Sequence, residues 1–186
     1  TLNTAVGNAA LTANTTASEN TAFGNEALTA NTTGSNNTAL GNQALLSNTT
    51  AQFNTGVGHH ALENNTTGAS NTAVGSDCLR ANTTADNNTA VGKSAMGGAG
   101  GNTANHFTAA QNTAIGRYAM HKMESGAANV AVGNNALENI TTGEGNIAIG
   151  NVAGGDLTTA TDNVFIGREA GNTTTGVDKT VIIGRS

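Results

Sequence analysis

The chain has 186 residues, of which 37% are hydrophobic and only 10% are charged, and its formal net charge is −5. This balance excludes the basic stripe with which proteins bind nucleic acid, and no apolar run approaches the length that spans a membrane. A single cysteine excludes an internal disulfide. There is one tyrosine and no tryptophan or proline, and alanine supplies much of the apolar content, so any hydrophobic core is thin.

Glycines recur along the whole chain at one spacing. Nine of the ten intervals between successive repeat glycines are 17 residues, and the remaining interval is 24. A fixed period of this length predicts a solenoid, in which each turn of chain is stabilised by the turns beside it. Residues 1–186 are therefore expected to form one domain of about eleven coils, one for each glycine. The repeat glycines are Gly7, Gly24, Gly41, Gly58, Gly75, Gly92, Gly116, Gly133, Gly150, Gly167 and Gly184.

Each copy of the repeat opens with a segment that predicts a short β-strand. In the first copy Thr4 and Val6 share one face of this strand, and Ala5 and Gly7 share the other, because side chains alternate. A helix is not expected, since threonine, asparagine and glycine are poor helix formers. We expect two or three short strands in each coil, stacked on the matching strands of the next. The strands expected from this pattern are residues 4–7, 21–24, 38–41, 55–58, 72–75, 89–92, 113–116, 130–133, 147–150, 164–167 and 181–184.

The later copies predict which strand face lies inside the coil. Valine or isoleucine replaces threonine at the position of Thr4 in the last copies, which favours an inward orientation for this face. The opposite face stays small for nine copies, and a row of small side chains lets another backbone approach closely. We therefore expect this small-residue stripe to contact partner chains. Its candidate members are Ala5, Ala22, Ala39, Gly56, Ala73, Phe165 and Ile182, the last two being larger.

Glycine and asparagine are expected at the corners of the coil. The glycine after each strand suits a turn with positive φ, and asparagine tolerates the same backbone region and bonds its own backbone. The Asn-Thr-Thr segment at Asn14 recurs in four later copies and is formally an N-glycosylation sequon, but a corner or a side-chain ladder explains its period without sugar. The scaffold residues of the repeat include Asn3, Gly7, Asn20, Gly24, Asn37, Gly41, Asn71 and Gly75.

The single break in the period is the best candidate for a binding feature. It leaves seven extra residues at 97–103, whose glycine content predicts a loop that bulges from the surface. Insertions in solenoids map to loops on one face, which is often the binding face. The alternative is a tolerated surface loop with no role, since loop insertions cost little. The candidate binding residues are Gly97, Gly98, Gly100, Gly101, Asn102, His106 and Phe107.

No side-chain cluster predicts catalysis, a cofactor or a metal ion. Cys78 stands where other copies carry alanine, and it is expected to be a small buried residue. His59 and His60 are adjacent, and neighbours on a strand point to opposite faces, so they are not expected to share a metal ion within one chain. No Ser/His/Asp arrangement stands clear of the repeat, and we do not expect an enzyme.

The unit Asn-Thr-Ala-Val-Gly-x-x-Ala-Leu, which first runs from Asn3 to Leu11, resembles known repeat families. It is similar to the head repeats of YadA-like trimeric autotransporter adhesins, and still more similar to the Asn-Thr-Ala-x-Gly arrays of bacterial and phage proteins with tail-fibre-type C-terminal domains. The resemblance covers residues 3–184. It implies a left-handed parallel β-roll and three chains side by side about a threefold axis, with the small-residue stripe at that axis. The autotransporter repeat is shorter, so 17 residues imply a wider coil.

The resemblance implies a structural and adhesive role, as shaft or head of a trimeric surface adhesin or tail fibre. Such a segment lies outside the cell, on a bacterial surface or a virion. The expected partners are copies of the chain, end-to-end neighbours or flanking domains, and an unknown surface receptor or glycan. An ice-binding solenoid would instead use stacked threonines such as Thr15 and Thr16, but adjacent threonines point to opposite faces. A polysaccharide-cleaving enzyme needs paired carboxylates in a groove, which the scattered aspartates and glutamates do not support.

Overall fold

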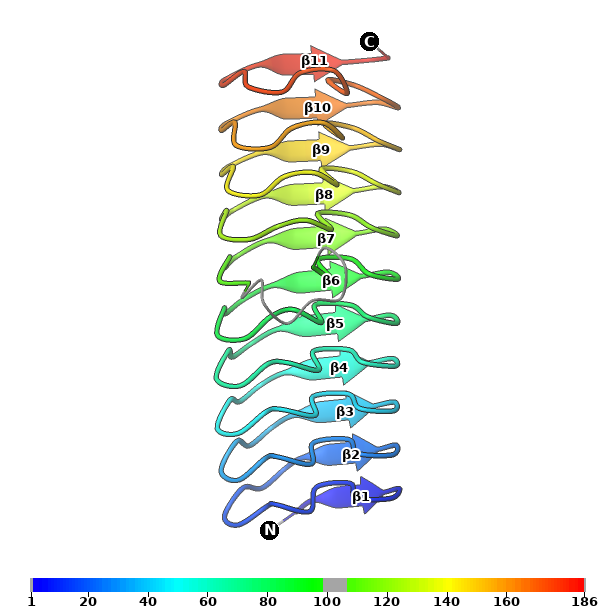
Figure 1. Cartoon of the computed structure of the whole chain (residues 1–186), viewed down its shortest axis with the longest axis vertical. Coiled ribbons are helices and arrows are strands. Elements are labelled where there is room, and N and C mark those ends of the chain that lie inside the picture. The colour runs from blue at the N-terminus through cyan, green and yellow to red at the C-terminus, as the bar shows by residue number, and fades with distance from the viewer. Residues whose placement is uncertain (1, 99–106, 186) are drawn as a thin grey trace.

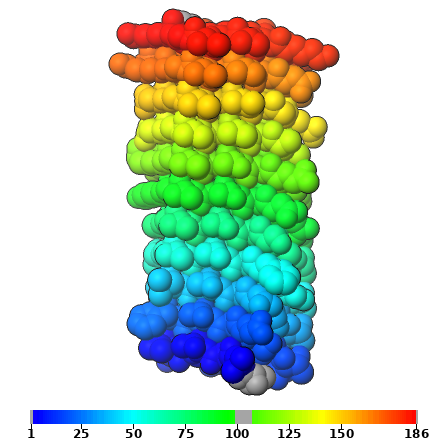
Figure 2. Space-filling view, turned by 180° about the vertical axis from the view of Figure 1, so that it is seen from behind, coloured from blue at the N-terminus to red at the C-terminus, as the bar shows by residue number. Residues whose placement is uncertain are grey.

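The computed structural model describes residues 2–98 and 107–185, and there the chain forms eleven strands and no helix. The strands form one parallel sheet in chain order, so the two termini lie at opposite ends of the stack (Figure 1). From the opposite side the coils are seen as successive layers (Figure 2). This architecture confirms the parallel β-solenoid predicted from the glycine period. The strands are β1 (Thr4–Val6), β2 (Thr21–Phe23), β3 (Thr38–Leu40), β4 (Thr55–Val57), β5 (Thr72–Val74), β6 (Thr89–Val91), β7 (Thr113–Ile115), β8 (Val130–Val132), β9 (Ile147–Ile149), β10 (Val164–Ile166) and β11 (Val181–Ile183).

Strand register follows the sequence repeat without a slip. Thr4 pairs with Thr21 between β1 and β2, and every later pair joins equivalent residues in the same way. The register also holds across the long interval, where Thr89 of β6 pairs with Thr113 of β7. The longer interval therefore leaves the register of the sheet unchanged.

Only one strand forms in each described coil, so the expectation of two or three was wrong. The rest of the coil is turns and bends, although it remains bonded to its neighbours. The backbone N–H of Leu11, for example, donates to the carbonyl of Ala27 at 2.9 Å. Left-handed φ angles of 56° at Ala9, 54° at Leu11 and 62° at Glu19 interrupt the extended conformation that a strand requires.

The glycine after each strand is demanded by the stacking of coils. Gly7 has a φ of 133°, and a Cβ atom there would lie 2.2 Å from the carbonyl oxygen of Gly24. This confirms glycine at the predicted positive-φ turn. The prediction that asparagine adopts the left-handed conformation at the other corner was wrong. The left-handed residue there is the one before the asparagine, such as Glu19 before Asn20.

The strand faces are opposite to those predicted. Ala22, Ala39 and Ala73 are fully buried inside the coil, whereas the first and third residues of each strand point outward. A Cβ at Gly56 would lie 3.4 Å from the side chain of Leu45, which shows how little space the interior holds. The small residues are small because each coil must also enclose an Ala-Leu pair.

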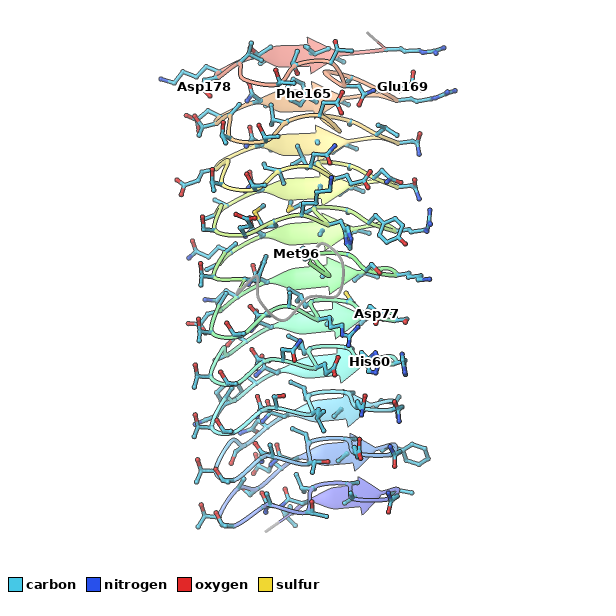
Figure 3. All side chains as sticks on the ribbon, viewed as in Figure 1. His60, Asp77, Met96, Phe165, Glu169 and Asp178 are labelled. Carbon is cyan, nitrogen blue, oxygen red and sulfur yellow. The ribbon has the colours of Figure 1, made fainter. Side chains whose placement is uncertain are left out.

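The small-residue stripe therefore does not lie at a surface where it could contact partner chains. Ala5 is exposed, and Ile182 is half-buried against the core, both in terminal coils. Phe165 points inward, where it fills the space left by Gly154 and Gly171, each of which stands where earlier coils carry leucine or methionine (Figure 3). The expectation that Phe165 adds apolar area at a trimer axis was wrong.

Two ladders of buried asparagines line the interior. In the first, the Oδ1 atom of Asn37 accepts the backbone N–H of Asn54 at 2.9 Å, and its Nδ2 atom donates to the carbonyl of Ala51 at 2.8 Å. In the second, Asn48 Nδ2 donates to Asn31 Oδ1 at 2.9 Å. Because Asn31 and Asn48 are fully buried, the ladder interpretation of the Asn-Thr-Thr segments is confirmed, and these side chains are closed to sugar attachment.

The second ladder ends at the insertion. Asn82 is joined by an isolated parallel bridge to Phe107, and the same row continues with the buried side chains of Met123 and Ile140. Asn82 Nδ2 still donates to Asn65 Oδ1 at 2.7 Å. Asn82 Oδ1, in contrast, has no hydrogen-bond partner within the described residues, because Phe107 offers no side-chain donor.

Candidate functional site

The outward face of the sheet exposes apolar side chains along its whole length. The third residue of each strand is always apolar, and Phe23 is 53% exposed, Leu40 43% and Ile115 42%. Monomeric proteins rarely leave a contiguous apolar patch larger than a few hundred Å² uncovered. The exposed members of this row are Val6, Phe23, Leu40, Val74, Ile115, Ile149, Ile166 and Ile183.

The first strand position changes character along the stack. It is threonine in β1 to β7 and valine or isoleucine in β8 to β11. Ile147 is 37% exposed and Val181 is 66% exposed at this position. The C-terminal part of the face therefore presents two apolar rows, and the N-terminal part presents one apolar row beside one row of threonine hydroxyls.

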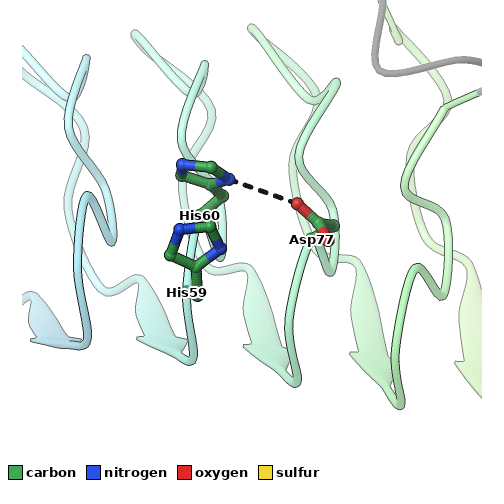
Figure 4. A group of neighbouring side chains, drawn as sticks. All are labelled: His59, His60 and Asp77. Carbon is green, nitrogen blue, oxygen red and sulfur yellow. Dashed lines mark hydrogen bonds and ion pairs between the residues drawn. The ribbon is translucent and has the colours of Figure 1, made fainter.

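A second feature is a cluster of His59, His60 and Asp77 on the edge of the solenoid, in the turns after β4 and β5 (Figures 3 and 4). The ring centroids of the two histidines lie 3.5 Å apart. The prediction that the two side chains point to opposite faces was wrong, because β4 ends at Val57 and both histidines lie in the turn that follows. Each of the three side chains offers one potential ligand atom, and these atoms lie within 4.8 Å of one another.

Equivalent positions of four successive coils connect into one polar chain that includes this cluster. Gln43 Nε2 donates to Glu26 Oε2 at 2.7 Å, and Gln43 Oε1 lies 2.7 Å from His60 Nε2. His60 Nδ1 in turn lies 3.3 Å from Asp77 Oδ1. Ser76 donates its hydroxyl hydrogen to the other carboxylate oxygen of Asp77 at 2.9 Å.

The electrostatics of this edge favour an ionised Asp77. Partial burial on its own would raise the pKa of the carboxyl group. The hydrogen bonds from Ser76 and His60 and the positive charge of Arg80 outweigh burial and hold the pKa of Asp77 below its ordinary value. Asp77 thus carries a negative charge at neutral pH.

The structure describes only the first two glycines of the predicted binding loop. Gly97 and Gly98 are both buried, so they do not bulge from the surface as expected. The backbone N–H of Gly98 donates to the carbonyl of His121 at 3.1 Å, which holds this segment against the next coil. Both glycines line a pocket of about 210 Å³ together with Asp77, Arg80, Ser94, Tyr118 and His121. The other candidates, Gly100, Gly101, Asn102 and His106, lie outside the described residues.

Phe107 is a core residue and not a surface contact. It is 1% exposed and packs within the hydrophobic interior, where it takes the place of a ladder asparagine. Its predicted role in binding was wrong, because burying the ring inside the coil removes it from water.

Cys78 is buried as the repeat predicts, with no exposed surface. Its Sγ atom lies 3.2 Å from the carbonyl oxygen of Ala90, to which the thiol donates. Burial raises the pKa of the Cys78 thiol to about 12. The protonated thiol acts as a small apolar residue in place of alanine.

Comparisons with protein-family models, with curated proteins and with solved structures gave no match. The described part of the chain contains no helix that could span a membrane.

The sequence analysis did not predict two features, the exposed apolar face of the sheet and the pairing of the two histidines. The β-branched residues at both outward positions, beside an inward alanine, were the signal for the exposed face. The signal for the paired histidines was that His59 and His60 directly follow Gly58, the glycine after the strand.

Proposed function

We propose that the chain is a segment of a trimeric fibre, in which the exposed face of β1 to β11 packs against two further copies of the chain. The observation that carries the proposal is the row of exposed apolar side chains that runs from Val6 to Ile183. Because every coil presents this row at the same place, chains in register match one another along the full sheet. The number three comes from the resemblance of the repeat to adhesin heads.

The proposed role is structural and adhesive, and it is not enzymatic. The fibre would stand outside the cell, on a bacterial surface or a virion, and would space or present a surface for a receptor or glycan. The thin interior of each chain favours assembly, because a coil that encloses mainly alanine and leucine buries little apolar area on its own. The pocket beside Gly97 and Gly98 is the candidate receptor contact.

Two substitutions at neighbouring positions test the proposal. Val74→Glu places a charge on the exposed face, and we expect a folded monomer in place of a trimer, measured by light scattering and circular dichroism. Ala73→Glu places a charge in the closed interior and should unfold the chain, since an unpaired carboxylate is costly there. Thr67→Glu, at an exposed corner, is the control and should leave mass and fold unchanged. A Val74→Glu chain that keeps the trimer mass would refute the placement of the interface.

Ice binding is a second candidate, favoured by the outward threonines of β1 to β7, one per coil on a regular sheet. Neighbouring parallel strands are about 4.8 Å apart, which gives this row an even spacing. The threonine row that begins at Thr15, which the sequence offers as the ice-binding array, bonds neighbouring coils instead. Thr32 Oγ1, for example, donates to the carbonyl of Thr49 at 3.1 Å. A thermal-hysteresis measurement decides the matter: activity that Thr72→Val abolishes favours ice, and its absence favours the fibre.

A further inference from the structure

The cluster of His59, His60 and Asp77 has the chemistry of a metal site, and this does not depend on assembly through the sheet face. Two imidazoles and one carboxylate are a ligand set that suits divalent transition metals of the zinc type. The side chain of His60 is 18% exposed and that of Asp77 is 29% exposed, and His59 is exposed, so an ion can enter from solvent. The two histidines come from one turn, and the aspartate comes from the equivalent turn of the next coil.

The hydrogen-bond chain determines which nitrogen of His60 carries a proton. Glu26 Oε2 accepts a hydrogen bond from Gln43 Nε2, which orients the amide of Gln43 with Oε1 toward His60. Gln43 Oε1 also only accepts, so His60 Nε2 must donate to it. The other nitrogen, Nδ1, then faces Asp77 Oδ1, which it can bond either as an N–H donor of a protonated ring or as a ligand of a metal ion that lies between the two atoms.

The spacing of these two atoms fits a metal ion in that position. Ligand atoms that lie about 2.1 Å from a tetrahedral zinc ion are about 3.4 Å from each other. The observed separation of His60 Nδ1 and Asp77 Oδ1 is 3.3 Å. The Gln43 contact resembles the outer hydrogen bond that orients most metal-bound histidines and raises their basicity.

The charged residues around the cluster leave Asp77 Oδ1 available to coordinate a metal ion. Arg80 Nη1 lies 3.7 Å from Asp77 Oδ1, but Arg80 Nε is paired more closely with Glu63 at 2.5 Å. Ser76 engages the second oxygen of Asp77 and so directs the first toward His60. One carboxylate oxygen and two imidazoles thus converge, with the exposed side left to water.

We propose that His59, His60 and Asp77 bind one divalent transition-metal ion of the zinc class per chain, with solvent in the remaining position. His60 coordinates through Nδ1 and Asp77 through Oδ1, and Gln43 and Glu26 hold the His60 ring in place. The ion joins two successive coils at the edge of the solenoid.

The test is a titration of the full chain with Zn²⁺ alone, measured by calorimetry and by competition with a chromophoric chelator. We expect one saturable site per chain that is lost in His59→Gln, His60→Gln and Asp77→Asn. Gln43→Met should weaken binding by about ten- to a hundredfold while leaving one site, as loss of an outer hydrogen bond does. His106→Gln and His121→Gln remove the remaining two histidines of the chain and serve as matched controls with unchanged affinity.

A second measurement keeps the proposal open to refutation if a variant fails to fold. In the unsubstituted chain, Zn²⁺ should shift the imidazole proton resonances of His59 and His60 and leave those of His121 in place. Binding no tighter than that of a folded double variant, His59→Gln with His60→Gln, would overturn the proposal. Equal shifts at His121 would do the same.

Discussion

Phe165 shows how a single residue is accommodated in a coil that has no spare room. Nine strands carry alanine or glycine at the inward position, and β10 carries phenylalanine. A Cβ at Gly171 would lie 2.5 Å from the Phe165 ring, and a Cβ at Gly154 would lie 2.9 Å from it. The large ring and the two missing side chains therefore compensate one another in volume.

This compensation predicts a coupled pair of substitutions. Phe165→Ala should lower the free energy of unfolding by about 3–5 kcal/mol, because it leaves a cavity. Gly171→Leu alone should also destabilise, because the new side chain meets the ring. The double variant restores the usual alanine and leucine, so its loss should be smaller than the sum by about 0.5–3 kcal/mol. Denaturant unfolding measures all three, with the exposed Phe53→Ala as a control within about 0.5 kcal/mol. Strict additivity would contradict the compensation.

The raised pKa of the Cys78 thiol predicts how the stability of the fold depends on pH. The thiol ionises near pH 9.0 in the unfolded chain, but burial raises its pKa to about 12 in the folded chain. Its contribution to stability is therefore complete below pH 9 and is lost as the pH rises toward 12. At pH 8 a thiol reagent should modify the chain only after denaturant is added, and Cys78→Ala should remove the part of the alkaline loss that this thiol causes. Prompt modification of the native chain would show that the thiol is accessible.

The two asparagine ladders fix how successive coils stack, which strands of only three residues do weakly on their own. In the first ladder a side chain such as that of Asn54 bonds two backbone groups, at Gly68 and Asn71, that lie 14 and 17 residues later in the chain, so three-residue strands are held at fixed spacing. The second ladder must end where no asparagine follows, and the unpaired Oδ1 atom of Asn82 marks that end among the described residues. The first ladder passes the insertion unbroken, because Asn112 donates its backbone N–H to Asn88 Oδ1 at 3.0 Å.

Removing one ladder member should cost more than its single side chain suggests. Asn54→Ala leaves the backbone N–H of Asn71 and the carbonyl of Gly68 without their partners, which lie 2.9 and 2.8 Å away. Two buried unpaired groups predict a loss of about 2–5 kcal/mol in the free energy of unfolding. Asn8→Ala, at an exposed position of the same residue type, is the matched control and should change stability by about 0.5 kcal/mol or less. Equal effects at the two positions would contradict the ladder account.

The repeat predicted the solenoid and the turn glycine because both depend on backbone geometry, which the period reports directly. The face assignment failed for a physical reason. Exchange of threonine with valine is compatible with a closed interior and with an exposed β-sheet surface, since β-branched residues suit both. The choice depends on how many side chains share the interior, and that is set by how residues such as Asn20, Ala22 and Leu28 pack in three dimensions, which the linear pattern does not report. The two successive turns that bring His59 close to Asp77 likewise depend on left-handed non-glycine residues, His60 and Asp77, which the repeat glycines do not predict.

For the whole molecule, the exposed sheet face links the fold to the proposed function. The face lies on one side of a stack whose interior is thin, and it becomes more apolar toward β11. Association should therefore be strongest in the C-terminal coils, where both outward rows are apolar. The outer edges of β1 and β11 also carry unpaired backbone groups in the described stack, which can template end-to-end contact with further copies or flanking segments.

The most direct test of the central claim is the mass of the unsubstituted chain by sedimentation equilibrium over a wide concentration range. The chain mass is 18.3 kDa, and a closed assembly through the sheet face predicts a single species of three times that mass. The same species should persist on dilution, because the interface runs the full length of the sheet. A mass of one chain at every concentration would contradict the proposal that this face is covered by further copies.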